Sequence, residues 1–113
     1  MFPEADWRLF RSVHRAALDR YCTRVLEECA ATIREADTSH ERYLRLFHLI
    51  KERDKSLAVA FDDLRRSTGI QRLAAMIALE LVTDEELDRF STPTRDSAIA
   101  LGNLYRSSER RRR

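Results

Sequence analysis

The chain has 113 residues, which is the length of one ordinary domain. It contains only two glycines and two prolines, and this argues against an all-β sandwich or barrel, because those folds use both residues in their turns. Hydrophobic residues make up 43% of the chain and charged residues 35%, which predicts an apolar core inside a highly charged surface. The composition therefore predicts a single all-α domain.

The net charge of +2 is distributed unevenly along the chain. Residues 106–113 hold five arginines and one glutamate, so the preceding residues carry a net charge of −2. A nearly neutral body argues against a domain that binds nucleic acid with one whole face. We therefore divide the chain into a helical domain over residues 1–105 and a basic, arginine-rich tail over residues 106–113.

Several features indicate a cytoplasmic protein that does not contact a membrane. Cys22 and Cys29 form no CxxC motif, and the acidic N-terminus lacks the apolar segment of a secretory signal. The most apolar stretch, Leu73 to Val82, has ten residues, whereas a membrane-spanning helix needs about 20. Lys51 and Lys55 are the two lysines among many arginines, a bias typical of a GC-rich bacterial or phage genome.

Two long helices are predicted first. Apolar residues recur every three or four positions from Trp7 to Ile33, which predicts a helix from Pro3 to about residue 37. Thr38 and Glu41 form a capping-box pattern before a second helix that we expect to end near Ser67. The short connection favours an antiparallel hairpin, with residue i opposite roughly residue 76 minus i. The apolar row of the second helix contains these residues: Tyr43, Phe47, Ile50, Asp54, Leu57, Phe61 and Leu64.

Three shorter helices are predicted over residues 70–82, 84–90 and 93–105. The first of them is apolar on almost every side, which predicts burial on more than one face. Thr83 and Glu86 form a second capping-box pattern before the next helix. A hairpin alone cannot cover the 70–82 helix, so either the last two helices or a second copy of the chain must do so. We expect a helical bundle built on a long antiparallel hairpin, assembled as a homodimer.

Two charged segments are candidate contact surfaces for another protein. One is the acidic segment with a nearby aromatic ring, which is also explained as the ordinary first turn of a helix. The other is the terminal arginine run, which is also explained as a solubilising end. Their residues are Asp84, Glu85, Glu86, Asp88 and Phe90, and Arg110, Arg111, Arg112 and Arg113.

Arginines on the first helix offer an alternative contact with nucleic acid. Arg8, Arg11 and Arg15 lie along one helical face, where they could contact phosphates together with the Arg110–Arg113 run. The simpler interpretation is a solvated face whose charges are paired within the chain.

Asp54 is the one charged residue in the apolar row of the second helix. Its place in this row predicts a buried charge, which is either a carboxylate with a functional role or half of a structural ion pair. The expected hairpin register also places Cys29 near His48, an arrangement that resembles half of a thiol nucleophile but is better explained by a buried core cysteine.

No catalytic or ligand-binding motif is present in the sequence. There is no Glu-x-x-His step for a metal site in a bundle, and Gly69 and Gly102 lie outside any phosphate-binding loop pattern. We therefore expect no metal, no cofactor and no enzymatic activity. The sequence favours a non-enzymatic adaptor, regulator or inhibitor acting through protein–protein contact, with a nucleic-acid-associated protein as the alternative.

Overall fold

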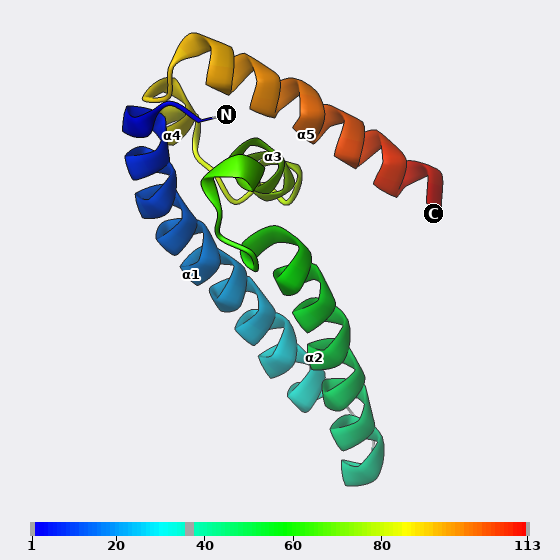
Figure 1. Ribbon diagram of the computed structural model, residues 1–113. Helices are drawn as coiled ribbons and strands as arrows, with labels where there is room; N and C mark the ends of the chain where they lie inside the picture. Colours follow the sequence, from blue (N-terminus) through cyan, green and yellow to red (C-terminus); the bar gives the residue numbers. More distant parts are fainter. Residues whose placement is uncertain (1, 36–37, 113) are drawn as a thin grey trace.

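The computed structural model describes residues 2–35 and 38–112, and their side chains as far as Ser108. No strand occurs in these ranges, so the all-α class is confirmed. Figure 1 shows the arrangement of the helices. In chain order the elements are α1 (Glu4–Arg34), α2 (Ser39–Phe61), a 3-10 turn (Arg66–Thr68), α3 (Gly69–Ala78), α4 (Asp84–Asp88) and α5 (Thr92–Arg112).

α1 and α2 lie side by side and run in opposite directions (Figure 1). Near the top of the pair, His14 Nε2 lies 3.1 Å from the carbonyl oxygen of Phe61. Near its far end, the Arg42 guanidinium donates to the carbonyl oxygen of Ile33 at 3.3 Å. The pair extends well beyond the other helices, which makes the molecule elongated, with extents of 52 × 29 × 24 Å.

The remaining helices gather beside the N-terminal half of α1, where α3 packs against α1 and α2 and α5 packs along α3 (Figure 1). We call this part of the molecule the head. Its largest fully buried side chains come from the N-terminal segment, α1, α3 and the turn after α3. α5 packs closely against α3 at Gly102, where an added Cβ would lie only 3.1 Å from the Ile77 side chain. The fully buried set is Phe2, Phe10, Leu73, Met76 and Leu81.

α3 is covered within one chain. Every residue from Leu73 to Ile77 is buried, with α5 packed along α3 and with α1 and α2 against its other sides. Of the two alternatives for covering this helix, the structure therefore shows cover by helices of the same chain, with α5 as the main neighbour. The apolar third helix gives no reason for a second copy, and any self-association must use another surface.

Two helices end earlier than their apolar patterns predict. α2 ends at Phe61 instead of Ser67, and Asp63 then adopts a φ of 63°. α3 ends at Ala78 instead of Val82, and Glu80 adopts a φ of 59°. Both residues have left-handed backbone, which reverses the chain direction after a helix although it is uncommon for residues other than glycine.

Gly69 is the first residue of α3. A Cβ at this position would lie 2.1 Å from the ring of Phe2, so the glycine makes room for a buried aromatic side chain. The capping box of Thr83 and Glu86 forms as predicted, with hydrogen bonds of 3.1 and 2.9 Å.

α5 continues through the position where the tail was expected to begin. The Arg106 guanidinium donates to the carbonyl oxygen of Ile77 at 2.7 Å, so this residue is part of the head. A search of the described helices for one that is long and apolar enough to span a bilayer finds none.

A buried carboxylate joins the first helix to the last. Asp6 accepts hydrogen bonds from the Ser91 amide at 2.9 Å, the Ser91 hydroxyl at 2.5 Å and the Thr94 hydroxyl at 2.6 Å. Burial by itself would raise the pKa of Asp6, but these hydrogen bonds outweigh it and lower the pKa below its ordinary value. Asp6 therefore ties the first turn of α1 to the residues that begin α5.

Candidate functional site

The part of α1 and α2 that projects beyond the head carries the most unusual surface of the molecule. We call this part the arm, residues 22–34 of α1 and 39–57 of α2 (Figure 1). Between residues 39 and 53, the half-buried residues of α2 follow steps of four, three and four, which is the spacing of a helix packed against one neighbour. We call these residues the contact row of α2: Arg42, Leu46, Leu49 and Arg53.

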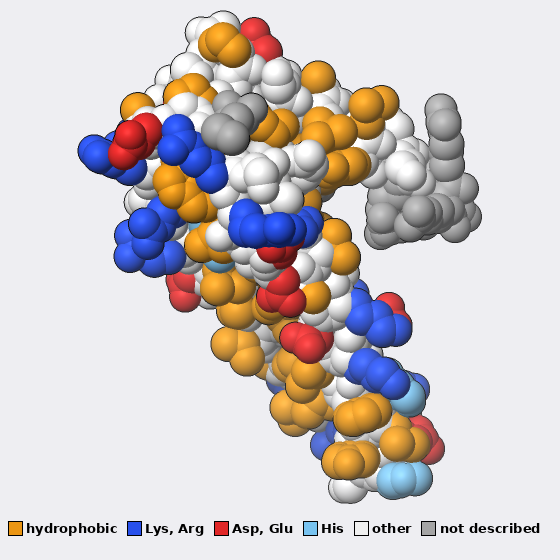
Figure 2. Space-filling view, viewed as in Figure 1, with side chains coloured by type: hydrophobic (Ala, Val, Ile, Leu, Met, Phe, Trp, Pro, Cys, Tyr) orange, Lys and Arg blue, Asp and Glu red, His pale blue; other side chains and the backbone are white. Residues whose placement is uncertain are grey.

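A second row of apolar residues is displaced by one position from the contact row and is not covered. Because one residue turns a helix by about 100° and the two helices are antiparallel, the displaced rows of α1 and α2 point to the same side. We call this surface the arm face, and Figure 2 shows apolar side chains gathered along the visible side of the arm. Its residues and exposed fractions are Leu26 (67%), Ile33 (51%), Tyr43 (65%), Phe47 (51%) and Ile50 (48%).

The arm face is large for the surface of a small protein. Five bulky apolar side chains, each about half exposed or more, present on the order of 500 Å² of apolar surface on two adjacent helices. Single exposed apolar residues need no explanation, but a continuous patch of several hundred Å² marks a contact site. The row on α2 was predicted from the sequence as part of the hairpin, and the structure places its N-terminal half in solvent.

Asp54 lies at one end of the α2 row of the arm face. It is exposed, so the prediction of a buried charge is wrong. Within residues 2–35 and 38–108, no hydrogen bond or ion pair reaches its carboxylate. At the other end of the same row, reached by steps of three and four residues, is the exposed His40. The arm face is therefore apolar in the middle, with a carboxylate and an imidazole at its two ends.

Cys29 and His48 do not form the thiol arrangement that was considered. Cys29 is buried and Cys22 is half-buried, and both thiols are free. His48 is exposed, and its ring packs edge-on against the ring of Phe47 with centroids 5.7 Å apart. The cysteines thus pack beside the arm face and show no feature of a nucleophile.

Two residues of the acidic segment are part of the head and cannot serve as a docking surface. Phe90 is 5% exposed and belongs to the core. Glu86 completes the α4 capping box and receives hydrogen bonds of 2.7 and 3.2 Å from Arg20. Burial acts to raise the pKa of Glu86, but Arg20 and the Thr83 amide lower it overall. The expectation for Glu86 and Phe90 is therefore wrong.

The other acidic residues do remain at the surface. Asp84 and Glu85 are exposed on the first turn of α4. Asp88 is exposed and forms an ion pair of 3.3 Å with Arg95 of α5. Without Glu86 and Phe90, these residues form a short charged edge with no apolar centre.

The basic residues do not form one surface. Arg8 pairs with Glu4 at 3.2 Å, whereas Arg11 and Arg15 are exposed and make no hydrogen bond or ion pair in the part of the chain that is described. The side chains of Arg110–Arg113 lie outside the described residues. The N-terminal half of α1 and the C-terminal end of α5 lie on opposite sides of the molecule (Figure 1), so one continuous contact with a nucleic acid would have to reach around the head.

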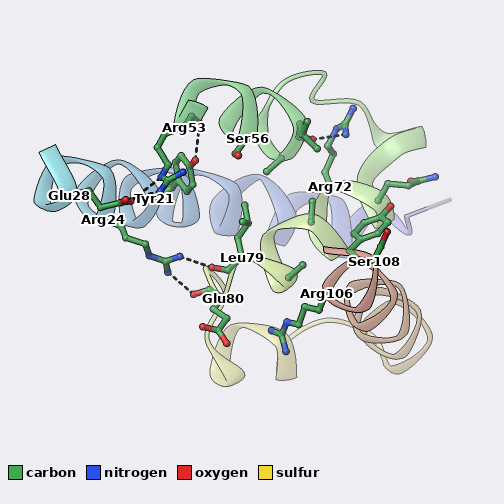
Figure 3. A pocket seen from close by; sticks show the side chains of 16 residues that line it. Tyr21, Arg24, Glu28, Arg53, Ser56, Arg72, Leu79, Glu80, Arg106 and Ser108 are labelled. Atoms are coloured by element: carbon green, nitrogen blue, oxygen red, sulfur yellow. Dashed lines mark hydrogen bonds and ion pairs between the residues drawn. The ribbon is translucent and has the colours of Figure 1, made fainter. Parts of the chain in front are cut away.

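A cleft of about 760 Å³ opens between α2, α3 and α5 and is lined by four arginines (Figure 3). Three of them donate to main-chain carbonyl oxygens near the ends of α2 and α3, and the fourth binds Glu28 with both ends of its guanidinium. The three bonds to carbonyl oxygens tie the ends of α2 and α3 to arginines of α1, α3 and α5. The pairs are Arg24 with Leu79 and Glu80, Arg72 with Val59, Arg106 with Ile77, and Arg53 with Glu28.

The lining of the cleft is therefore occupied by structural contacts and not by a set of reactive groups. No three His, Cys, Asp or Glu side chains converge as metal ligands in the portion that the structure describes. Comparison of the chain with protein-family models, with curated proteins and with solved structures finds no match. The arm face is the strongest candidate for a functional site.

Proposed function

We propose that this protein is a non-enzymatic helical adaptor or regulator that acts through protein–protein contact at the arm face. The observation that carries the proposal is the uncovered apolar surface shared by α1 and α2. Helical surfaces of this kind bind partner helices, because an amphipathic helix buries its own apolar side when it packs onto them.

The arrangement of the charges supports a contact through apolar side chains. The four arginines of the cleft are already bonded to carbonyl oxygens and carboxylates of this chain, whereas Leu26, Tyr43 and Phe47 have no cover of their own. Burial of these side chains in a complex is expected to supply most of the binding free energy, at roughly 25 cal/mol per Å² of apolar surface. A bacterial or phage cytoplasm is the setting we propose, which agrees with two free thiols.

A photo-reactive amino acid placed in the arm face tests the proposal. The full chain carries p-benzoylphenylalanine at position 47 or, as a control, at position 104, where Leu104 of α5 is 65% exposed. Irradiation in cells is expected to produce covalent protein adducts from position 47 and far fewer from position 104. Equal labelling from the two positions, or none from position 47, would contradict a contact through the arm face.

Nucleic acid is a second candidate partner, favoured by the unpaired guanidinium groups of Arg11 and Arg15. Binding to phosphates weakens steeply as salt increases, because counterions are released from the nucleic acid. This function predicts salt-sensitive binding of DNA or RNA that falls when residues 109–113 are removed. The truncation should end at Ser108, because Arg106 is needed by Ile77 in the head. Failure to bind either nucleic acid at low salt would exclude it.

A further inference from the structure

The apolar residues of the arm face are distributed symmetrically about one level of the arm. On α1, Leu26 and Ile33 are equally far from the midpoint between residues 29 and 30. On α2, Tyr43 and Ile50 are equally far from the midpoint between residues 46 and 47. The contact of Arg42 with Ile33 fixes the register of the two helices and places both midpoints at nearly the same level.

This symmetry is what a two-fold axis requires. In an interface between identical copies, residue i contacts residue j and residue j contacts residue i. A two-fold axis that crosses the arm at the common midpoint places Leu26 opposite Ile33 of the partner subunit, and Tyr43 opposite Ile50 of the partner subunit. Each half-exposed apolar side chain then meets another one.

The same axis also provides a partner for Asp54. Positions 40 and 54 are symmetric about residue 47, within half a residue of the midpoint of the apolar pairs. Asp54 is therefore carried to His40 of the partner subunit, and this contact occurs twice. A carboxylate and an imidazole can form a hydrogen bond or, when the imidazole is protonated, an ion pair. Neither side chain has such a contact within its own chain, as far as the structure describes it.

The size of the arm face fits a pair of copies. Two arm faces together would bury on the order of 1,000 Å² of apolar surface from these side chains alone, which reaches the range of specific protein interfaces. Two antiparallel helices facing two others also make a four-helix bundle, in which every helix has two neighbours.

We infer that the arm face binds the arm face of a second copy of this chain, in an antiparallel four-helix bundle with the two heads at opposite ends. The inference rests on the proposed function and names the partner for it. A parallel alternative, with both heads at the same end, would place Asp54 against Cys22 of the partner subunit and leave the carboxylate without a complementary group. We thus propose the homodimer contact at the arm and not at α3, which is covered by helices of its own chain.

Sedimentation equilibrium of two matched leucine variants tests the inference. Leu26 and Leu104 are 67% and 65% exposed, and each becomes glutamate in one variant, Leu26→Glu in the arm and Leu104→Glu in the head. The wild-type protein is expected to have twice the chain mass of 13.3 kDa. Leu26→Glu is expected to raise the dimer dissociation constant at least about 30-fold, because both copies lose an apolar contact. Leu104→Glu is expected to change it less than about threefold.

A second arm variant and circular dichroism guard against a folding defect. Phe47→Glu replaces another exposed side chain, so both arm variants should keep the helical spectrum of the wild type while losing the dimer. A wild-type monomer at about 100 µM overturns the inference, since a specific interface of this size holds at that concentration. Dimerisation of Leu26→Glu and Phe47→Glu at wild-type affinity overturns it as well.

Disulfide cross-linking tests the orientation of the two copies. In a background with Cys22→Ser and Cys29→Ala, a cysteine introduced by Phe47→Cys lies next to the two-fold axis and should cross-link to its own counterpart on mild oxidation. Tyr43→Cys alone should not, because its counterpart is Ile50 of the partner subunit. A dimer in which Phe47→Cys fails to cross-link would overturn the antiparallel arrangement.

The outcomes separate this inference from the proposed function. A monomer whose position 47 photo-cross-links to a different protein in cells would end the inference and keep the proposed function. A monomer with no adduct at position 47 would end both.

Discussion

The head and the arm are built partly from the same two helices but use them differently. In the head, α1 has neighbours on several sides, and Phe10 and Ala17 are completely buried. In the arm, the same helix has one neighbour, and Leu26 is two-thirds exposed. The apolar periodicity is equally regular in both regions. A regular apolar pattern therefore predicts a helix face suited to burial, but it does not predict whether a segment of the same chain packs against that face.

The largest expected difference between the regions concerns truncation of apolar side chains. Leu73→Ala in the head should lower the free energy of unfolding by about 3 kcal/mol, because the leucine is completely buried and the change leaves a cavity. Ile50→Ala in the arm should lower the stability of the monomer by less than about 1 kcal/mol, since Ile50 is half exposed. Urea unfolding of both variants at a concentration where the protein is monomeric checks the comparison. Equal losses would show that the arm is packed as firmly as the head.

The buried carboxylate of the head should make stability depend on pH. The pKa of Asp6 is lower in the folded protein than in the unfolded chain, so its stabilisation is present above the unfolded value and is lost as the pH falls through the folded value. Asp6→Asn should cost about 2 kcal/mol at pH 7, because an amide cannot accept all three hydrogen bonds.

Unfolding of Asp6→Asn from pH 7 down to about pH 2 is then expected to be less sensitive to acid than that of the wild type. Asp19→Asn, at an exposed position of α1, serves as the control and should follow the wild type. An unchanged acid dependence in Asp6→Asn would contradict the contribution of this carboxylate.

A smaller effect is expected from adding a methyl group at Gly69, where the ring of Phe2 already occupies the space. Gly69→Ala places a Cβ against the ring of Phe2, so the ring must move within the head, at a cost of about 1.5 kcal/mol. Thermal unfolding measures this cost. Gly69→Ala should cost less when position 2 already carries Phe2→Leu, because the smaller side chain leaves room for the added Cβ. An equal cost in both backgrounds would mean that the strain does not come from the ring of Phe2.

The smallest effect is expected from the ion pair of the arm. The Arg53 guanidinium holds the pKa of Glu28 below its ordinary value, but both side chains are more than one-third exposed. Glu28→Gln should therefore cost only about 0.5 kcal/mol, and added salt should reduce the difference. A cost comparable to that of Asp6→Asn would mean that the arm depends on its charges as the head does.

Local signals predicted much of the fold. The helical class, the capping box of Thr83 and Glu86, and both ends of α1 to within about three residues follow from periodicity and capping residues. The expected opposite position for Ile33 was residue 43, and the observed contact is with residue 42. Contacts of this kind depend mainly on helix geometry and on a short connection, both of which are visible in the sequence.

Long-range contacts were not predictable in the same way. Asp6 lies in a first turn where an acidic residue is ordinary, and nothing nearby indicates that it binds Ser91 and Thr94. The left-handed residues Asp63 and Glu80 end helices inside apolar patterns that continue past them. Of the candidate site, Tyr43, Phe47 and Ile50 were identified correctly as one row, but their exposure depends on where α3 and α5 pack. The positions of α3 and α5 depend on contacts between segments far apart in the sequence, which local patterns do not predict.

The arginines that bind main-chain oxygens change how the composition of this protein should be understood. Arg24 spans two successive carbonyl oxygens with the two ends of one planar group, and a lysine ammonium would have to serve both from a single point. Exchange of arginine for lysine keeps the charge but gives up this fit. The arginine bias of the sequence therefore also has a structural consequence: at these positions a codon change from arginine to lysine keeps the charge but loosens the ends of two helices.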